Sequence, residues 1–385
     1  MLMERISAFN PERFLWCCED FGLSPEDVAQ ALQISEASIA KIVGGELGPT
    51  FGQLRKIAKY FNRGVLFFIQ HGAVDEENVR TPQFRSLSKQ KPDLSPDVKK
   101  LIERAERQRE VYLDLREDLK ADPLPRFRPP ETDANKPAEA ASAVRRWLKL
   151  AERNSFVQTR KAIEDRGVMV LMGVGYYGDW RLPSESPIVG FSTYHERCPL
   201  ILVKKQRNVG RQLFTLAHEL GHLVMHRSSF IDDEDDLLAT RGRERQANLF
   251  AGHLLVPDRF LENINTEGQP TDGQALYDRL KPWAGRWGVS VEMLILRLVE
   301  NQKLARTDYD KYRTWLSALP LNDEDGGGSR SYRHREPLHL FGDRYVRTVL
   351  DAYRANQISL NKASGFLDNL KISDVHELER YVADV

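Results

Sequence analysis

Two histidines four residues apart, with a glutamate directly after the first, stand in the apolar stretch LFTLAHELGHLVMH at residues 213–226. On an α-helix, residues four apart lie about 40° apart around the axis, so His218 and His222 project from one face about one turn apart. Two imidazoles placed in this way can share one metal ion. Glu219 is rotated about 100° from His218, which lets it act on a metal-bound water without being a ligand. The pattern therefore predicts a zinc site of the H-E-x-x-H type.

The residues around the two histidines bear on an alternative, in which the histidines face solvent or an internal partner. Their neighbours are apolar and predict a largely buried helix: Phe214, Leu216, Ala217, Leu220, Leu223 and Val224. Buried imidazoles need either a hydrogen-bond partner or a metal ion. The buried helix therefore favours the metal.

A catalytic zinc ion takes a third protein ligand and leaves its fourth position to water. The candidates downstream are Glu244, His226, His253 and the acidic run at 232–236. His226 lies roughly 12 Å along the helix from His218, too far to join the same tetrahedral site. We expect it to cap the negative end of the helix or to line the cleft. The acidic run has no helical framing and is interpreted as a solvated loop.

Glu244 begins a predicted helix, RERQANLFAGHLL, in which Ala247 and Ala251 provide a smooth face. Small residues there would let this helix approach the histidine helix closely. Asn248, one turn after Glu244, is placed to hold a metal ligand in position. The alternative role for Glu244 is to stabilise the N-terminus of its own helix, and the two roles are compatible.

The elements that must position these residues begin upstream. The β-branched runs VMVLMG, PIVGFSTY and PLILVKK predict three strands, preceded by the amphipathic helices AEAASAVRRWLKLAE and NSFVQTRKAIEDRG. Near the N-terminus, Ser24 and Thr50 are predicted helix caps, and Gly44 and Gly45 are expected to end the helix between them. A long charged helix and the proline-rich ADPLPRFRPPETDANKPAEA follow, and the second is typical of a linker or exposed loop.

Composition limits the possible functions. A chain of 385 residues is longer than one ordinary compact domain, so two or three units are expected. Because it carries 56 basic and 56 acidic side chains, any binding to nucleic acid must be local. Three cysteines without paired-ligand spacing fit a reducing compartment better than a disulfide framework. No run of about 18 apolar residues occurs, so we expect a soluble, cytoplasmic protein.

The segments FTLAHELGHLVMH and ERQANLFAGHLLVP together resemble the ImmA/IrrE zinc peptidases, whose pattern is F-T-x-A-H-E-L-G-H followed by E-x-x-A-N-x-F-A-x-x-L-L-x-P. The resemblance covers about residues 80–305. It implies an α+β zincin-like fold with a small sheet packed on helices, and the activity of a zinc metalloendopeptidase. It further implies Zn²⁺ held by His218, His222 and Glu244, with Glu219 as the catalytic base. His253 stands where the family is variable.

The segment LSPEDVAQALQISEASIAKIVGGELGPTFGQLRKIAKYF resembles the Cro/C1-type (XRE) helix-turn-helix. Ala29 stands at its small-residue position, and Ile39 and Ile42 on the inner face of the recognition helix. The resemblance implies that four side chains face the major groove: Glu36, Ala37, Ser38 and Lys41.

This sequence departs from the helix-turn-helix pattern in its turn and in its charge. Gln33 stands where a glycine is usual, and residues 1–75 hold more acids than bases. The cations available for phosphates are mainly Lys41, Arg55, Lys56, Lys59 and Arg63. The alternative is a small helical domain used for dimerisation or for docking another protein.

Together these observations predict a multidomain chain with five regions. They are a helix-turn-helix domain at 1–72, a charged helix and proline-rich linker at 73–137, the peptidase at 138–305, a flexible linker at 306–337 and a helical C-terminal region at 338–385.

The combination resembles bacterial and phage regulators in which proteolysis relieves repression. The first hypothesis is a DNA-binding transcriptional regulator of stress response or mobile-element control, whose peptidase cleaves a helix-turn-helix repressor. The alternative is a non-catalytic transcription factor or antitoxin-like protein, in which the peptidase fold serves as a sensor or docking surface. The expected partners are a DNA operator, the protein substrate, a toxin and a second copy in a homodimer, without a membrane.

Overall fold

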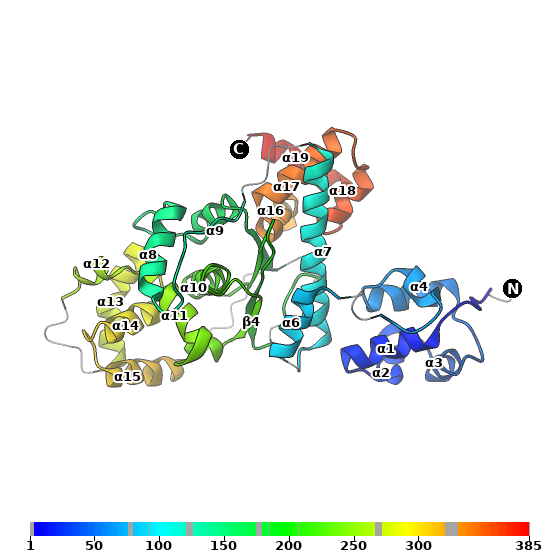
Figure 1. Ribbon diagram of the computed structural model, residues 1–385, viewed down its shortest axis with the longest axis horizontal. Coiled ribbons are helices and arrows are strands. Elements are labelled where there is room, and N and C mark those ends of the chain that lie inside the picture. The colour runs from blue at the N-terminus through cyan, green and yellow to red at the C-terminus, as the bar shows by residue number, and fades with distance from the viewer. Residues whose placement is uncertain are drawn as a thin grey trace. The chain divides into compact units, whose positions relative to one another are not determined.

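The computed structural model describes residues 4–75, 80–91, 93–120, 126–174, 179–183, 185–206, 208–265, 272–319 and 330–384. The chain separates into two compact units, Met1–Arg104 and Ala105–Val385, and each is described by itself (Figure 1). No helix in the described part of the chain is long and apolar enough to cross a membrane.

The first unit is helical. Its elements are α1 (Pro11–Phe21), α2 (Pro25–Leu32), α3 (Glu36–Val43), α4 (Phe51–Tyr60), the 3-10 helix η1 (Val65–Ile69), α6 (Pro82–Gln90) and the first part of α7 (Pro96–Asp118). The expected caps are confirmed, since Ser24 Oγ accepts a hydrogen bond from the Asp27 N–H (3.1 Å) and Thr50 Oγ1 from the Gln53 N–H (3.2 Å). A core of aromatic and aliphatic side chains, including Phe14, Val28, Ile39, Ile57 and Phe61, holds these short helices together.

The second unit contains the remaining elements. They are the rest of α7, α8 (Pro137–Leu148), α9 (Phe156–Glu164), β1 (Met169–Gly173), β2 (Ile188–Thr193), β3 (Leu200–Lys204), α10 (Val209–Gly221), the π-helix η2 (His222–His226), β4 (Phe230–Asp233), the 3-10 helix η3 (Asp236–Leu238), α11 (Gly242–Leu255), α12 (Asp258–Leu261), α13 (Gly273–Trp287), α14 (Val291–Glu300), α15 (Arg306–Ser317), the 3-10 helix η4 (Arg330–Arg335), α16 (Glu336–Phe341), α17 (Asp343–Arg354), α18 (Leu360–Phe366) and α19 (Ile372–Asp384).

The sheet of this unit has four strands in the order β1-β3-β2-β4. β1 runs parallel to β3, whereas β2 pairs antiparallel with both β3 and β4. β1 and β2 are buried throughout, because α10 covers one face of the sheet and the second half of α7 lies on the other (Figure 1). This burial explains the apolar sequence of β1 and the largely apolar first part of β2, and the three expected strands are confirmed.

The acidic run begins on the fourth strand, β4, which corrects the expectation of a solvated loop for its first two residues. β4 pairs with β2, and Asp232 on it is only 1% exposed. The preceding apolar pair, Phe230 and Ile231, is also buried. The pairing of β4 with β2 therefore buries Asp232, the first residue of the acidic run.

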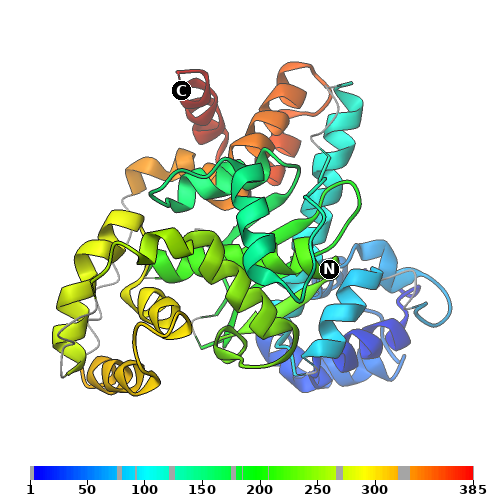
Figure 2. The ribbon, with the colours of Figure 1, turned by 60° about the vertical axis from the view of Figure 1, so that its left-hand side comes forward.

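Small residues allow α10 and α11 to pack closely. A Cβ added to Gly221 would lie 2.9 Å from the Phe250 ring and 3.5 Å from Ala247 Cα. Ala247 and Ala251 are fully buried, as expected for the face of α11 that meets α10. The two helices thus bring residues more than twenty positions apart in sequence to one place (Figure 2).

The flexible linker expected at 306–337 is wrong for its first part. Residues 306–317 form α15, in which Tyr309 and Tyr312 are buried. The Tyr309 hydroxyl donates to Glu292 Oε1 of α14 at 3.1 Å, so α15 is part of the packed unit. The glycine-rich segment at 320–329 lies outside the described residues.

The helical C-terminal region packs on the sheet. α16 lies against β1, the strand at the other end of the sheet from β4. Arg160 of α9 joins the two, since it donates to the backbone carbonyl of His339 in α16 at 2.6 Å and to that of Val170 in β1 at 2.5 Å. The tail therefore covers an edge strand, which is one way in which proteins protect unpaired backbone groups.

Candidate metal centre

The histidine stretch forms α10 and the π-helix η2 that continues it. Asn208 caps α10 by accepting a hydrogen bond from the Gly210 N–H at 2.9 Å. The helix packs its apolar face against β2 and β3, and His218, Glu219 and His222 are each 0% exposed. Three ionisable side chains are thus held where water cannot solvate them, so each requires a partner or an ion.

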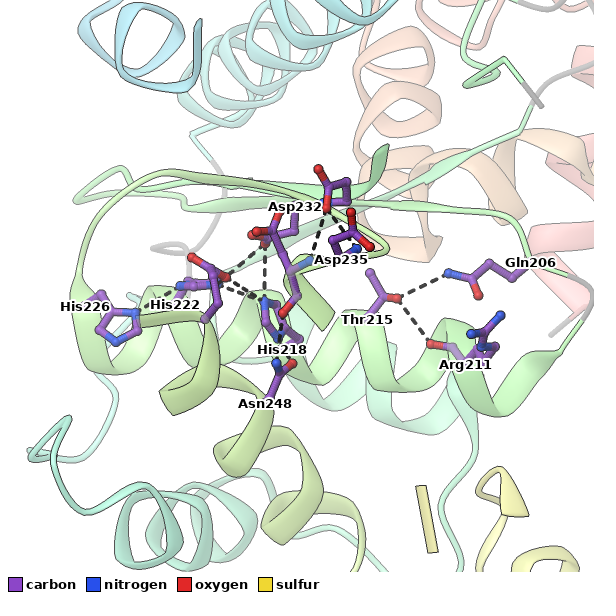
Figure 3. Close-up of polar contacts among 12 residues, drawn as sticks. Gln206, Arg211, Thr215, His218, His222, His226, Asp232, Asp235 and Asn248 are labelled. Carbon is purple, nitrogen blue, oxygen red and sulfur yellow. Dashed lines mark hydrogen bonds and ion pairs between the residues drawn. The ribbon is translucent and has the colours of Figure 1, made fainter. Parts of the chain in front are cut away.

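Four residues bring potential ligand atoms within 4.8 Å of one another: His218, His222, Asp232 and Glu244. The Nε2 atoms of the two histidines are 2.9 Å apart. Glu244 Oε2 lies 3.3 Å from His218 Nε2 and 3.1 Å from His222 Nε2. Asp232 Oδ2 lies 3.4 Å and 3.5 Å from the same two atoms. In Figure 3, Asp232 and His222 converge on the His218 ring from neighbouring elements.

This spacing fits one tetrahedral ion. Zinc binds nitrogen and oxygen ligands at about 2.0–2.2 Å, so neighbouring corners of its tetrahedron lie about 3.3–3.6 Å apart. The five distances above run from 2.9 to 3.5 Å. Asp232 Oδ2 is buried, and no described residue donates a hydrogen bond of normal geometry to it, so its lone pairs can face an ion.

Hydrogen bonds fix the tautomer of His218. Its Nδ1 lies 2.9 Å from Asn248 Oδ1, and the Asn248 amide nitrogen donates to the Asp236 carbonyl at 2.9 Å. Since the amide oxygen can only accept, His218 carries its proton on Nδ1 and presents the Nε2 lone pair to the centre. Asn248 therefore lies where the sequence places it, behind a histidine and not among the donors.

His222 is oriented by a longer chain of contacts. Its Nδ1 lies 2.9 Å from His226 Nδ1, and His226 Nε2 lies 3.0 Å from Gln246 Oε1. With the Gln246 oxygen accepting from His226 Nε2, His226 Nδ1 accepts from His222 Nδ1, and the His222 Nε2 lone pair faces the centre. Burial is the largest cause that lowers the pKa of His226 to about 4, so His226 is neutral as this relay requires. It is not among the four clustered donors.

The centre has an excess of negative charge. Burial lowers the pKa of His218, but the Asp232 and Glu244 carboxylates outweigh burial and raise that pKa to about 9. Burial likewise raises the pKa of Glu244, but the two histidines outweigh it and lower the pKa well below its usual range. Without a metal ion this field draws a second proton to His218, onto Nε2, and a divalent cation would take the place of that proton.

Glu219 lies beside the cluster without being one of its donors. Neither of its carboxylate oxygens accepts a hydrogen bond of normal geometry from the described residues. Burial, and then the nearby Asp232 carboxylate, raise its pKa well above the usual value. Gly190 of β2 makes room for it, because a Cβ there would lie 2.8 Å from Glu219 Oε1 and 3.0 Å from Thr215 Cγ2.

His253, the remaining ligand candidate, lies elsewhere. Its Nε2 lies 3.0 Å from Glu300 Oε1 and its Nδ1 2.9 Å from Arg297 Nη2. The sequence did not indicate two contributors to the centre, Gly190 and Gln246, and a third, Asp232, was a ligand candidate that was wrongly assigned to a solvated loop. For Asp232 the missed signal was the apolar pair before it, which is typical of a strand.

In the first unit, α3 buries one face and exposes the other. Ile39 and Ile42 are buried, while Glu36, Ala37 and Lys41 are exposed and Ser38 is half-buried. Gln33 in the turn adopts a left-handed conformation with φ 54°.

Arg63 does not belong with the cations expected to contact phosphates. It is 8% exposed and forms a bidentate pair with Glu103, at 2.7 and 2.9 Å. The expected cationic surface is therefore smaller by one residue.

Comparisons with known proteins find two different domain families, one in each unit of the chain. Residues 181–299 match the family model of the IrrE N-terminal-like domain, a peptidase family, and residues 16–68 match the helix-turn-helix model. The four clustered donors and Glu219 all lie within the first match. A search of the curated proteins finds no match. The expected fusion of the two kinds of domain is confirmed.

Proposed function

We propose that this chain, which joins a helix-turn-helix domain to an IrrE N-terminal-like peptidase domain, is a transcriptional regulator that acts as a zinc-dependent endopeptidase. The observation that carries the proposal is the buried His218–His222–Glu244 cluster with Glu219 beside it. A buried carboxyl group to which no described residue donates a hydrogen bond of normal geometry is costly, and a role in proton transfer accounts for it.

When bound, Zn²⁺ supplies a Lewis acid that lowers the pKa of water and stabilises charge on a peptide carbonyl oxygen. His218 and His222 present their Nε2 lone pairs, held in that tautomer by Asn248 and by the His226 relay. A Glu219 oxygen takes the proton of the attacking water and delivers it to the leaving amide nitrogen. The burial that raises the pKa of Glu219 makes it a better proton acceptor.

The substrate that we propose is a regulatory protein, specifically a helix-turn-helix repressor of stress-response or mobile-element genes. The helix-turn-helix domain of this chain supports a site of action at an operator or on a repressor, since α3 exposes its outer face. Cutting the repressor would then switch transcription.

The test is cleavage of candidate repressors by the purified full-length chain with Zn²⁺. We expect the Glu219→Gln chain to bind metal like the wild type but to cut at least about 10²-fold more slowly, because it lacks the proton acceptor. Glu262→Gln, at an exposed position after α12, is the matched control and should cut normally. Equal cleavage by the wild type and Glu219→Gln would refute proteolysis of those targets.

A further inference from the structure

We propose that Asp232 is a fourth protein ligand, which closes the metal centre in the resting protein and must leave before the peptidase can act. This inference rests on the proposed function, because it takes the same centre to hold Zn²⁺. Asp232 lies on β4, outside the two sequence segments that supply His218, His222 and Glu244.

Distances place Asp232 at a corner equivalent to that of Glu244. Glu244 Oε2 is 3.1 and 3.3 Å from the two histidine Nε2 atoms, and Asp232 Oδ2 is 3.4 and 3.5 Å from them. Both pairs of values are close to the edge of a tetrahedron around one zinc ion, about 3.3–3.6 Å. Asp232 is also the more buried of the two, with its side chain 1% exposed against 22% for Glu244.

The neighbouring acids show that Asp232 differs from the rest of the run. Asp233 Oδ1 accepts hydrogen bonds from the backbone N–H groups of Asp235 (2.9 Å) and Asp236 (3.1 Å). Asp236 Oδ2 accepts from the Asp233 N–H at 2.9 Å. These two carboxylates shape the turn after β4, whereas Asp232 Oδ2 accepts no such bond from the residues that the structure describes and faces the histidines.

The pairing of β4 with β2 aims Asp232 at the centre. Alternate residues of a strand share a face, so Phe230 and Asp232 point the same way. The Phe230 ring stacks on His222 with centroids 3.8 Å apart, which fixes that face toward the donors. A register shift between Ile188 and Gly190 lies opposite, and such bulges redirect side chains.

Four protein ligands make a closed site, whereas a catalytic zinc ion keeps one position open for water. If Asp232 takes the fourth corner, the resting protein has no such position. In the described sheet β4 stands at the end of the strand order and pairs with β2, so a shift of this short strand would free the corner. Peptidase activity would therefore depend on the position of β4.

The experiment uses the full-length chain, stripped of metal and titrated with Co²⁺, whose visible absorption reports its ligands. The variants are Asp232→Ala, the isosteric Asp232→Asn, and Asp235→Ala, at an exposed position of the same acidic run, as a control for charge. Azide, an anion that needs an open position, is then added to each. We expect azide to leave the wild-type and Asp235→Ala spectra unchanged and to shift those of both Asp232 variants. We also expect both Asp232 variants to bind Co²⁺ at least about tenfold more weakly.

Azide shifting the wild-type spectrum as it shifts the variants', or Asp232→Asn binding Co²⁺ as tightly as the wild type, would overturn the proposal. His218→Ala separates this outcome from a failure of the centre itself. If His218→Ala loses Co²⁺ affinity and the Asp232 variants do not, only the fourth ligand is wrong. If His218→Ala also binds normally, the proposed metal centre is wrong as well.

Discussion

At His218 and His222, function depends on which ring nitrogen carries the proton. Asn248 and the His226–Gln246 relay each leave Nε2 unprotonated, so that both lone pairs point to one place. The residues behind the histidines should therefore matter to metal affinity although they touch no metal.

Replacing Asn248 tests this dependence. We expect Asn248→Leu to weaken Zn²⁺ binding about 10–100-fold, because His218 loses its acceptor and its fixed tautomer. Asn248→Asp keeps an acceptor oxygen and should bind Zn²⁺ far better than Asn248→Leu. Competition with a chromophoric chelator measures both affinities, and equal binding by wild type and Asn248→Leu would contradict the argument.

Gly190 offers a second test at the residue scale. Gly190→Ala places a methyl group against Glu219, Thr215 and the Leu202 carbonyl, and we expect it to lower the free energy of unfolding by about 1–3 kcal/mol. Gly285→Ala is the control, since nothing lies within 4 Å of its added Cβ on α13 and a helical alanine should stabilise by about 0.5–1 kcal/mol. Urea denaturation measures the free energy of unfolding of both variants. A Gly190→Ala chain as stable as the wild type would show that the space beside Glu219 can accommodate a methyl group.

At the scale of elements, the backbone of the turn between α2 and α3 is strained at Gln33. Gln33 stands where related motifs use glycine, and its φ of 54° confirms a left-handed backbone. A non-glycine residue in this region costs about 1–2 kcal/mol.

We expect Gln33→Gly to stabilise the first unit by about 0.5–1 kcal/mol, since relief of strain exceeds the added entropy of the unfolded chain. Gln30→Gly, one turn earlier inside α2, should instead destabilise it by about 1 kcal/mol. Chemical denaturation followed by helical circular dichroism measures both. A destabilised Gln33→Gly chain would mean that the side chain contributes more than its strain costs.

The recognition helix allows a further prediction. If α3 enters a major groove, Lys41→Gln should weaken DNA binding and reduce the slope of log affinity against log salt by about 1. Arg63→Gln should leave that slope unchanged, because Arg63 is already paired with Glu103. Fluorescence anisotropy over a salt series, with a DNA fragment that the wild type binds, distinguishes the two. Equal slopes for Lys41→Gln and the wild type would remove α3 from the interface.

At the scale of the molecule, metal binding should contribute to folding. The buried centre unites donors from α10, η2, β4 and α11, and without a cation its carboxylates repel one another. A metal that binds only the folded state stabilises it by about 2.7 kcal/mol at a concentration 100 times its dissociation constant.

We therefore expect Zn²⁺ to raise the melting temperature of the metal-free chain by roughly 5–10 °C at that concentration, for a domain of this size. Calorimetry with and without Zn²⁺ measures the shift, and His218→Ala should abolish it. A shift that survives in His218→Ala would place the stabilising ion elsewhere.

The sequence by itself determined the features that depend on local chemistry. The spacing of His218 and His222, the caps at Ser24 and Thr50, and the apolar runs of β1 to β3 each express a period or a preference within one segment. Ala247 and Asn248 also belong here, because the period of a single helix places them relative to Glu244.

Only the tertiary structure decided what depends on partners distant in sequence. Asp232 looked like part of a solvated acidic run until strand pairing buried it, and Gly190 gained its meaning from Glu219, which no local pattern connects to it. The sequence alone suggested that Arg63 could contact phosphate, but it forms an ion pair with Glu103. Residues 306–317 were predicted as a linker, but they form a helix whose Tyr309 donates a hydrogen bond to Glu292 of α14. The physical reason is common to all four. Burial and pairing depend on which segments meet in space, and the type of a residue does not reveal whether its side chain lies in solvent or in a core.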